Sequence, residues 1–204
     1  TQTPLPKGFA GVLRPYQQRG YAWLTALANL NLGGCLADDM GLGKTIQTLV
    51  MLQHFYQEGQ KPPSLLICPT SVIENWVREA ARFVPNLPLF VHYGARRLKG
   101  EAFAKALQGT ALVISSYALL QRDIELYTTI RGDGVILDEA QNIKNPGTRQ
   151  ARAARNLKSR WRIALTGTPI ENHVGDLWSL LEFLNPGFLA KRARFQRPLL
   201  RAIQ

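Results

Sequence analysis

The sequence has little of the chemistry that would make it a disulfide-stabilised or zinc-binding protein. Its 204 residues include two cysteines, Cys35 and Cys68, and each lies in a short apolar run. The three histidines, His54, His92 and His173, are far apart and show no ligand spacing. Because a disulfide framework or a zinc site needs more cysteines at closer spacing, we interpret all five residues as structural. Buried free thiols indicate a reducing, intracellular compartment, so we expect the cytoplasm, nucleoid or nucleus.

Long apolar runs are also absent. No segment approaches the roughly 20 apolar residues that a membrane span requires, so we expect no membrane-spanning helix. The first eight residues lack the charged-then-apolar order of a secretory signal. The sequence opens with Thr1 and not with Met, and we therefore expect it to be a piece of a longer protein.

Acidic residues are scarce in the last third of the chain. From Lys144 onward there are twelve Lys or Arg residues and three acids, so this part carries +9 of the total formal charge of +11. Such an excess favours an anionic polymer as partner, because cations that neutralise phosphates release condensed counterions. A solvated basic face that aids solubility explains the charge equally well, and composition leaves both readings open.

Short apolar segments alternate with helical patterns along the chain, and no internal repeat interrupts them. The length fits one domain with a substantial core. Several apolar segments have no polar face, as expected for strands that helices cover on both sides. The pattern predicts an α/β fold with a mostly parallel central sheet. The predicted strands are 34–37, 65–68, 89–92, 112–115, 135–137 and 162–165.

Helix starts are marked by local signals. Pro15 suits a first helical position, and a second helix is predicted from Lys44 to Gly59. Ser71 with Glu74 three residues later predicts a capping box. A last helix is predicted to end at Asn185. Apolar residues at helical spacing are assigned to the core, among them Trp23, Leu24, Leu27, Trp76, Val174, Leu177, Trp178, Leu181 and Leu184.

The segment 38–45 lies between a predicted strand and a predicted helix, the setting of a phosphate-binding loop. Gly41 and Gly43 allow the backbone to close around an anion, whose charge the helix N-terminus favours. Lys44 would reach the β- and γ-phosphates of ATP, and the Thr45 hydroxyl would join the Mg²⁺ shell. Asp38 stands where the general pattern has a glycine.

Two adjacent acids follow the apolar segment 135–137. An apolar strand that ends in Asp138 and Glu139 delivers both carboxylates to the edge where open α/β sheets bind ligands. Asp138 would hold Mg²⁺, and Glu139 would orient and deprotonate the attacking water. Alone, this pair fits an exposed turn. With a phosphate-binding loop upstream, the pattern favours nucleotide hydrolysis.

Six ordered segments between about residues 13 and 189 resemble the motifs of the SWI/SNF-like ATPases. They are Leu13-Arg14-Pro15-Tyr16-Gln17 with Trp23-Leu24, Asp39 to Thr45, Ile67-Cys68-Pro69-Thr70-Ser71 with Asn75-Trp76, Ser115-Ser116-Tyr117, Asp138-Glu139-Ala140-Gln141, and Leu165-Thr166-Gly167-Thr168-Pro169 with Glu171-Asn172 and Leu177 to Leu181. The Asp-Glu-Ala-Asp and Ser-Ala-Thr motifs of DEAD-box RNA helicases are absent.

The resemblance implies a RecA-like domain and assigns further roles. Gln17 would recognise adenine, and Gln141, which stands where the family usually has His, would sense the γ-phosphate. Thr166 and Thr168 would couple that signal to the nucleic acid. One strand's phosphates would be contacted by Pro69, Thr70, Ser71, Ser115, Ser116 and Tyr117. A helix cap or turn is the competing role for these loop residues, because Ser71 already begins the predicted capping box.

The resemblance also implies two RecA-like lobes, of which the second supplies an arginine to the ATP site. We expect residues 1–189 to form the N-terminal, monomeric ATP-binding lobe and 190–204 to form a basic tail that leads towards the second lobe. A finger arginine contributes about 10³–10⁵ in rate, so the lobe alone should bind ATP weakly and hydrolyse it very slowly.

Three functions are compatible with these motifs. The first is an ATP-driven translocase on duplex DNA that remodels bound proteins. The second is a strand-separating helicase of superfamily two that acts on DNA or RNA. The third is a nucleic-acid-binding module without turnover, against which the intact Lys44, Thr45, Asp138 and Glu139 argue.

Basic residues at three-residue spacing also allow a cationic ridge on a helix. Its members would be Arg149, Arg152, Arg155 and Lys158. A solvated outer face is the competing reading. Lys191, Arg192, Arg194, Arg197 and Arg201 are equally basic and equally open in role.

Overall fold

The computed structural model describes residues 3–59, 63–130, 132–168 and 174–189. The six strands fall where the apolar runs predict them: β1 (Gly34–Leu36), β2 (Ser64–Cys68), β3 (Leu89–Val91), β4 (Leu112–Ser116), β5 (Gly134–Asp138) and β6 (Trp161–Leu165). They form one sheet in the order β1-β6-β5-β2-β4-β3, and every described pair is parallel. The predicted α/β fold is confirmed.

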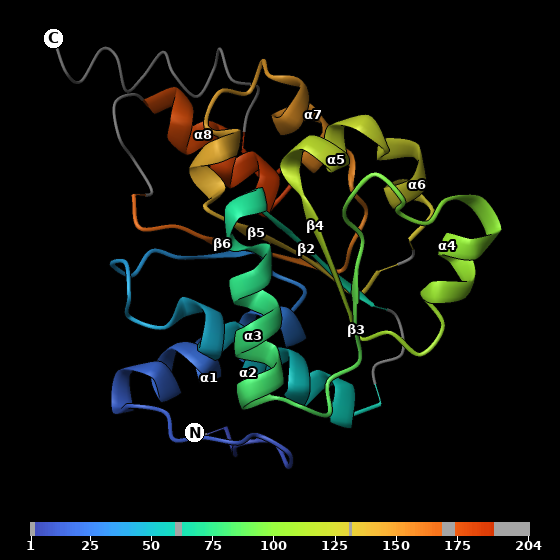
Figure 1. Ribbon diagram of the computed structural model, residues 1–204. Coiled ribbons are helices and arrows are strands. Elements are labelled where there is room, and N and C mark those ends of the chain that lie inside the picture. The colour runs from blue at the N-terminus through green and yellow to red at the C-terminus, as the bar shows by residue number, and fades with distance from the viewer. Residues whose placement is uncertain (1–2, 60–62, 131, 169–173, 190–204) are drawn as a thin grey trace, which may run out of the picture.

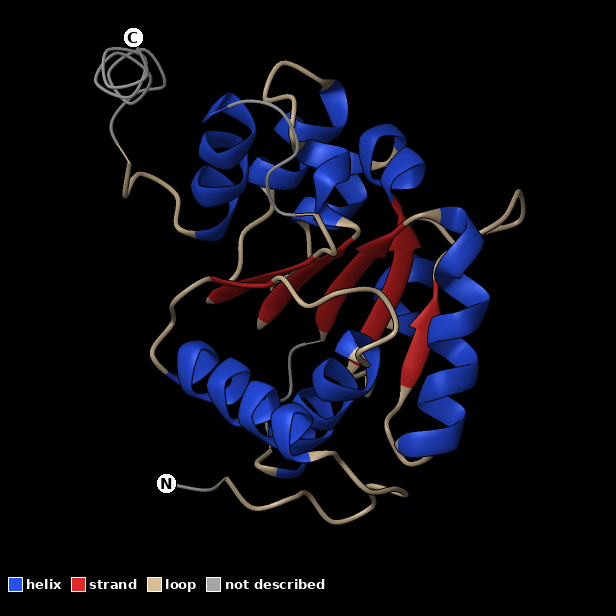
Figure 2. Ribbon diagram, turned by 90° about the vertical axis from the view of Figure 1, so that its left-hand side faces the viewer, coloured by secondary structure: helices blue, strands red, loops and turns tan. Residues whose placement is uncertain are grey.

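Helices cover both faces of this sheet (Figures 1 and 2). One face packs against α1 (Pro15–Asn29), α2 (Lys44–Gln57) and α3 (Ile73–Phe83). The other packs against α4 (Gly100–Ala106), α5 (Tyr117–Arg122), α6 (Ile124–Thr128), α7 (Arg149–Asn156) and α8 (Val174–Leu184). Two short 3₁₀ turns, η1 (Thr70–Val72) and η2 (Ala140–Ile143), follow β2 and β5.

Strand β5 shows why the central strands are apolar throughout. Successive side chains of a strand point to opposite faces. Ile136 therefore packs with α1, α2 and α3, whereas Val135 and Leu137 pack with the helices of the other face. Both faces are covered by helices, so a polar residue at any of these three positions would lose its contact with water.

Some residues assigned to the core lie elsewhere. On α1 the buried face is Tyr21, Leu24 and Ala28, and Trp23 is 43% exposed. On α8, Leu177, Trp178 and Leu181 are only half-buried, and the buried side chains are Ser179, Leu180, Phe183 and Leu184. The predictions for Leu24 and Leu184 are confirmed and Leu27 is half-buried, whereas the other predicted residues lie at the edge of the buried face. The side chain of Val174 lies outside the described part.

The predicted capping box at Ser71 is wrong. The chain makes the 3₁₀ turn η1 before α3, so Val72 is the N-cap of α3 and no side chain caps it. The hydroxyl of Ser71 is exposed instead. At the start of α5, Ser116 does take the capping role, because its Oγ accepts a hydrogen bond from the Leu119 N–H.

The two cysteines differ in burial, because Cys68 is buried and Cys35 is half-buried. Cys35 and Cys68 are free, and burial raises the pKa of the Cys68 thiol to about 12. His92 is fully buried, and the His54 ring packs against Tyr21 and Phe55. His173 lies outside the described residues, as do Pro169, Glu171 and Asn172 and the whole basic tail 190–204.

Candidate functional site

Three strands end side by side at the carboxyl edge of the sheet. The register pairs Leu36 of β1 with Leu165 of β6, and Leu165 with Asp138 of β5. The residues that follow these three positions are the loop 38–43, Thr166 and Glu139. Open parallel sheets bind ligands at this edge. The fold therefore places three of the predicted motifs together.

The loop between β1 and α2 has the backbone that an anion site needs. Gly41 and Gly43 both have φ of +81°, in the left-handed region. A Cβ at Gly43 would lie 2.4 Å from the amide nitrogen of Gln17, so a larger residue would displace the Gln17 side chain and strain the left-handed backbone. No side chain caps the N-terminus of α2. The first N–H groups of this helix are thus available to a phosphate.

The Lys44 ammonium lies over this loop. Its Nζ donates hydrogen bonds to the backbone oxygens of Asp38 at 2.6 Å and Asp39 at 3.0 Å. Thr45 is half-buried in the first turn of α2. Both residues are therefore located where phosphates and their metal ion would be bound, although their roles remain predictions.

Asp38, the departure from the general loop pattern, has a buried partner that the sequence motifs did not predict. The Gln47 side chain is fully buried under the loop and donates to Asp38 Oδ2 at 3.4 Å and to the Gly43 backbone oxygen at 3.3 Å. Gln47 lies one helical turn after Gly43, so this spacing could have suggested the contact. The side chain ties both ends of the loop to α2.

Gln17 connects α1 to the same loop. Its Oε1 accepts from the Arg14 N–H at 2.9 Å, and its Nε2 donates to the Leu42 backbone oxygen at 3.2 Å. The side chain is 9% exposed. Its position beside the loop supports a role in nucleotide binding, and recognition of adenine remains a prediction.

Asp138 is a half-buried carboxylate whose two hydrogen-bond donors are uncharged. Its Oδ2 accepts from the indole N–H of Trp76 at 2.8 Å, and its Oδ1 accepts from the Glu139 N–H at 3.0 Å. Burial is the main cause that raises the pKa of the Asp138 carboxyl. The helical spacing of Trp76 predicted a core residue and gave no sign of this contact, because the two residues are 62 positions apart.

Glu139 has a strained backbone. Its φ of 49° and ψ of 54° lie in the left-handed region, which is uncommon for a residue with a side chain. Such strain costs about 1–3 kcal/mol and is concentrated at functional sites. Because the backbone turns at Glu139, the side chains of Asp138 and Glu139 point in different directions although the two residues are adjacent.

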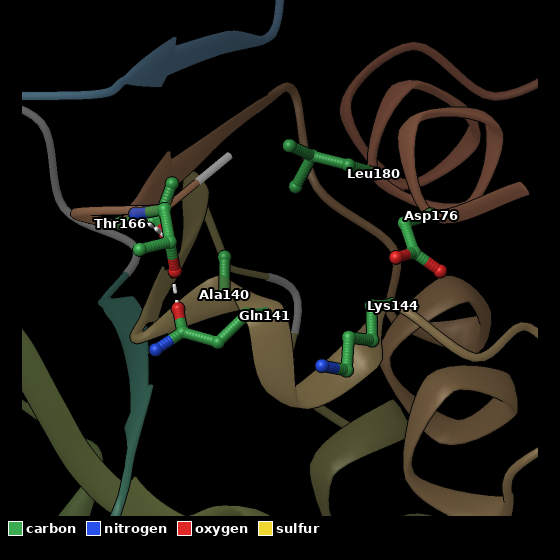
Figure 3. A pocket seen from close by; sticks show the side chains of 7 residues that line it. Ala140, Gln141, Lys144, Thr166, Asp176 and Leu180 are labelled. Carbon is green, nitrogen blue, oxygen red and sulfur yellow. Dashed lines mark hydrogen bonds between the residues drawn. The ribbon is translucent and has the colours of Figure 1, made fainter. Parts of the chain in front are cut away.

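A relay of hydrogen bonds leads from Glu139 to the end of β6. Gln141 Nε2 donates to Glu139 Oε2 at 2.8 Å, and Thr166 Oγ1 donates to Gln141 Oε1 at 2.9 Å. The Thr168 N–H in turn donates to Thr166 Oγ1 at 3.0 Å. Figure 3 shows Gln141 and Thr166 joined beside Ala140. The predicted coupling residues thus lie in direct contact.

A small cavity adjoins this relay (Figure 3). Its volume is about 10 Å³, close to the space that one water requires. It is lined by Ala140, Gln141, Lys144, Thr166, Thr168, Asp176 and Leu180.

The predicted nucleic-acid contacts divide into two groups. Thr70 and Ser71 are exposed at the end of β2, and Pro69 before them is half-buried. Ser115, Ser116 and Tyr117 are buried by contrast, with side chains 0%, 2% and 3% exposed. The second group therefore does not offer its side chains to a phosphate at the surface.

Internal hydrogen bonds explain why the second group is buried. Ser115 Oγ donates to the His92 backbone oxygen at 2.9 Å and lies 2.5 Å from the Tyr127 hydroxyl. Tyr117 donates its hydroxyl proton to the Asp138 backbone oxygen at 2.8 Å. With the cap formed by Ser116, these contacts lock the start of α5 onto the sheet.

The predicted cationic ridge is not continuous. Helix α7 ends at Asn156, so Lys158 lies beyond it. Arg152 and Arg155 fold back onto the loop before the helix and donate to the backbone oxygens of Gly147 and Pro146. Burial lowers the pKa of the half-buried Arg155. These bonds support the competing view, in which the helix forms an ordinary outer face.

The donor set at the carboxyl edge fits Mg²⁺ with a nucleotide. Within the described ranges, no three His, Cys, Asp or Glu side chains are grouped to hold a metal by themselves. Mg²⁺ is commonly held by one or two protein oxygens together with phosphates and water. Asp138 and Thr45 offer such oxygens next to an open anion loop.

No helix in the described part of the chain combines the length and apolarity needed to cross a membrane.

The sequence pattern of the SNF2-related domain matches residues 16–204. The Bacillus subtilis (strain 168) protein YwqA, whose name describes an ATP-dependent helicase/translocase, is 47% identical over 190 residues, which are 93% of this chain and 21% of YwqA. Helicase SWR1 of Candida albicans is 42% identical over 196 residues, 93% of this chain and 12% of SWR1. The chain thus spans about a fifth or less of the length of these relatives.

Two solved structures share the fold. The Sulfolobus solfataricus SWI2/SNF2 ATPase core in complex with dsDNA has a TM-score of 0.87 and 42% identity, and covers 97% of this chain and 40% of that chain. The same core domain without DNA in its description has a TM-score of 0.83 and 44% identity, with coverage of 94% and 38%.

Proposed function

The chain belongs to the SNF2-related domain family, and from this premise we propose that it is the ATP-binding lobe of a DNA-stimulated ATPase. This ATPase translocates on duplex DNA and remodels protein–DNA complexes. The observation that carries the proposal is the meeting of Lys44, Asp138 and Glu139 at one sheet edge, with Glu139 joined to Thr166 through Gln141.

The ATP chemistry is assigned to residues of that edge. Thr45 and Asp138 would hold Mg²⁺, which would offset the charge of the phosphates. Lys44 exchanges the backbone oxygens of Asp38 and Asp39 for phosphate oxygens. Glu139 takes the proton of the attacking water, and Gln141 fixes the Glu139 carboxylate for that step.

Gln141 is well suited to this link although the family usually has His. Its amide donates to Glu139 with one atom and accepts from Thr166 with the other, so the direction of the relay is fixed. An amide does not titrate near neutral pH. Coupling through Gln141 therefore depends on geometry and not on a change of charge.

Duplex DNA is the proposed track, and Thr70 and Ser71 are its proposed contacts on this lobe. Their hydroxyls are exposed at the carboxyl edge, next to the strand that carries Asp138. Hydroxyls bind phosphate without reading bases. The description of the Sulfolobus core as a complex with dsDNA supports this choice of partner.

A second RecA-like lobe is part of the proposal. The relatives are several times longer than this chain, and a second lobe would bring the arginine that completes the ATP site. We place the first lobe at residues 1–189 and the connection at 190–204, of which the latter is outside the described residues. The first lobe alone is expected to hydrolyse ATP very slowly.

The test is steady-state ATP hydrolysis by the full-length protein without nucleic acid, and with duplex DNA, single-stranded DNA or RNA. The Lys44→Ala variant serves as the blank. Stimulation by duplex DNA that the variant lacks is the expected result. Stimulation by RNA or single strands instead would indicate a helicase, and no hydrolysis under any condition would favour a binding module.

A further inference from the structure

The indole of Trp76 makes a contact that packing alone does not require. The side chain is 1% exposed, and its N–H points to Asp138 Oδ2 at 2.8 Å. A phenyl ring would fill most of the same apolar space between α3 and the sheet. The extra feature of tryptophan here is a hydrogen-bond donor aimed at the carboxylate that we assign to Mg²⁺.

This contact leaves Asp138 able to bind a cation. Each carboxylate oxygen has about two acceptor positions. Trp76 occupies one position on Oδ2 and the Glu139 N–H occupies one on Oδ1. One position remains on each oxygen, and the carboxylate cannot rotate without losing both donors.

The helix that carries Trp76 starts at the proposed nucleic-acid surface. The exposed Thr70 and Ser71 belong to η1, which runs directly into α3 at Ile73. Trp76 lies in the first turn of α3, so only four residues separate it from Ser71. A second segment at the same edge also reaches Asp138, because Tyr117 at the start of α5 donates to its backbone oxygen.

We propose that Trp76 is a positioning residue that orients the Asp138 carboxylate for Mg²⁺ and transmits movement of the η1 turn to it through α3. The proposal rests on the function proposed above. Donors to a metal-binding residue commonly affect metal affinity 10- to 100-fold, roughly, when they are removed. Trp76→Phe keeps an aromatic ring that fills most of the same space and removes the donor.

The chain contains a matched control. Trp161 is 2% exposed, and its indole N–H donates to Asp133 Oδ2 at 2.9 Å at the opposite end of β5. Trp161→Phe therefore removes the same kind of bond, from an equally buried ring, far from the proposed site. Both variants are expected to lose stability, but only Trp76→Phe is expected to lower the affinity for Mg²⁺.

The first readout is binding of fluorescent ADP to the 204-residue chain as Mg²⁺ is titrated. We expect Trp76→Phe to raise the half-saturating Mg²⁺ concentration about 10- to 100-fold, with unchanged affinity for metal-free ADP. Trp161→Phe should match the native chain. An unchanged Mg²⁺ dependence in a folded Trp76→Phe variant overturns the proposal.

The second readout is tryptophan emission, which keeps the test decisive if Trp76→Phe does not fold. Mg²⁺·ADP should change the emission of the native chain, and the change should persist in Trp23→Phe, Trp161→Phe and Trp178→Phe. If the emission change disappears in one of these three variants, it comes from that tryptophan and not from Trp76, which contradicts the proposal. A native chain whose emission does not respond to Mg²⁺·ADP also contradicts it.

The readouts separate this inference from the proposed function. A native chain that binds no Mg²⁺·ADP contradicts the ATP site itself. Normal binding with an indifferent Trp76→Phe variant contradicts only the role of Trp76. In the full-length protein, duplex DNA should lower the Mg²⁺ concentration required for ADP binding in the native form and not in Trp76→Phe.

Discussion

The two ends of β5 carry the same pair of side chains with different consequences. Asp133 directly precedes the strand and Asp138 is its last residue. Each accepts a hydrogen bond from a buried indole, Trp161 at 2.9 Å and Trp76 at 2.8 Å. The shared arrangement allows the other partners of each carboxylate to be compared directly.

The difference lies in the second partner. Arg160 neutralises Asp133 through an ion pair at 2.8 Å. Asp138 receives a neutral backbone N–H instead, and burial raises the pKa of its carboxyl. The amino end of the strand is thus complete within the fold, whereas the carboxyl end is arranged for an added cation. Lys44 attracts the Asp138 carboxylate without forming an ion pair with it, so a full counter-charge at this end would come from outside.

The largest effect is expected for Glu139→Gln at the carboxyl end. The change keeps the size of the side chain and removes the base, which should lower the hydrolysis rate of the full-length protein about 10²- to 10⁴-fold. Single-turnover hydrolysis and nucleotide binding should be measured together. Retained binding with lost hydrolysis is expected, and normal turnover would contradict the role of Glu139.

At the amino end, Asp133→Asn should affect stability and not chemistry. The amide has one acceptor oxygen in place of two, so either the buried Trp161 indole loses its acceptor or the exposed Arg160 loses its ion pair. The expected cost is about 1–3 kcal/mol in the free energy of unfolding. Denaturant unfolding measures this cost. A change in nucleotide affinity at unchanged stability would contradict the separation of the two ends.

An effect on hydrolysis smaller than that of Glu139→Gln is expected for Gln141→Ala, which breaks the relay. Thr166 is 1% exposed and would lose its acceptor, and Glu139 would lose a donor. Hydrogen bonds to a charged group are worth about 1.5–3 kcal/mol, so DNA-stimulated hydrolysis should fall about 10-fold or more. Gln141→His can still donate and accept, and it should retain most activity. Equal loss in both variants would argue against the relay.

The smallest effect concerns pH. Because the pKa of Asp138 is higher in the folded chain than its ordinary value, the folded chain binds this proton more tightly than the unfolded chain. Its contribution to the stability of the nucleotide-free chain is present at low pH and is lost as pH rises through the folded pKa. Thermal unfolding from pH 4 to pH 8 should show this slope in the native chain and not in Asp138→Asn.

Local patterns predicted most of this molecule. The loop 38–45 and the pair Asp138-Glu139 are contiguous, so sequence alone indicated their chemistry, and the six apolar runs became six strands. Contacts between distant residues were not visible. Trp76 was assigned to the core because its acceptor is 62 residues away.

Side-chain direction was the second source of error. Ser115 was predicted to contact phosphate, but its Oγ points to the His92 backbone oxygen inside the sheet layer. Arg152 and Arg155 have helical spacing, yet they bond to carbonyls of the preceding loop. Residue spacing identifies the face of a helix or strand on which a side chain lies. It does not show which hydrogen-bond partner a polar side chain on that face has.

The most direct test of the contrast between the two ends is amide hydrogen exchange of this chain with and without Mg²⁺·ADP. We predict slower exchange at 38–45 and 138–141, with a smaller decrease across 70–76, and no change at 132–134 and 159–162. Protection at the amino end, or none at the carboxyl end, would contradict the assignment of the ATP site.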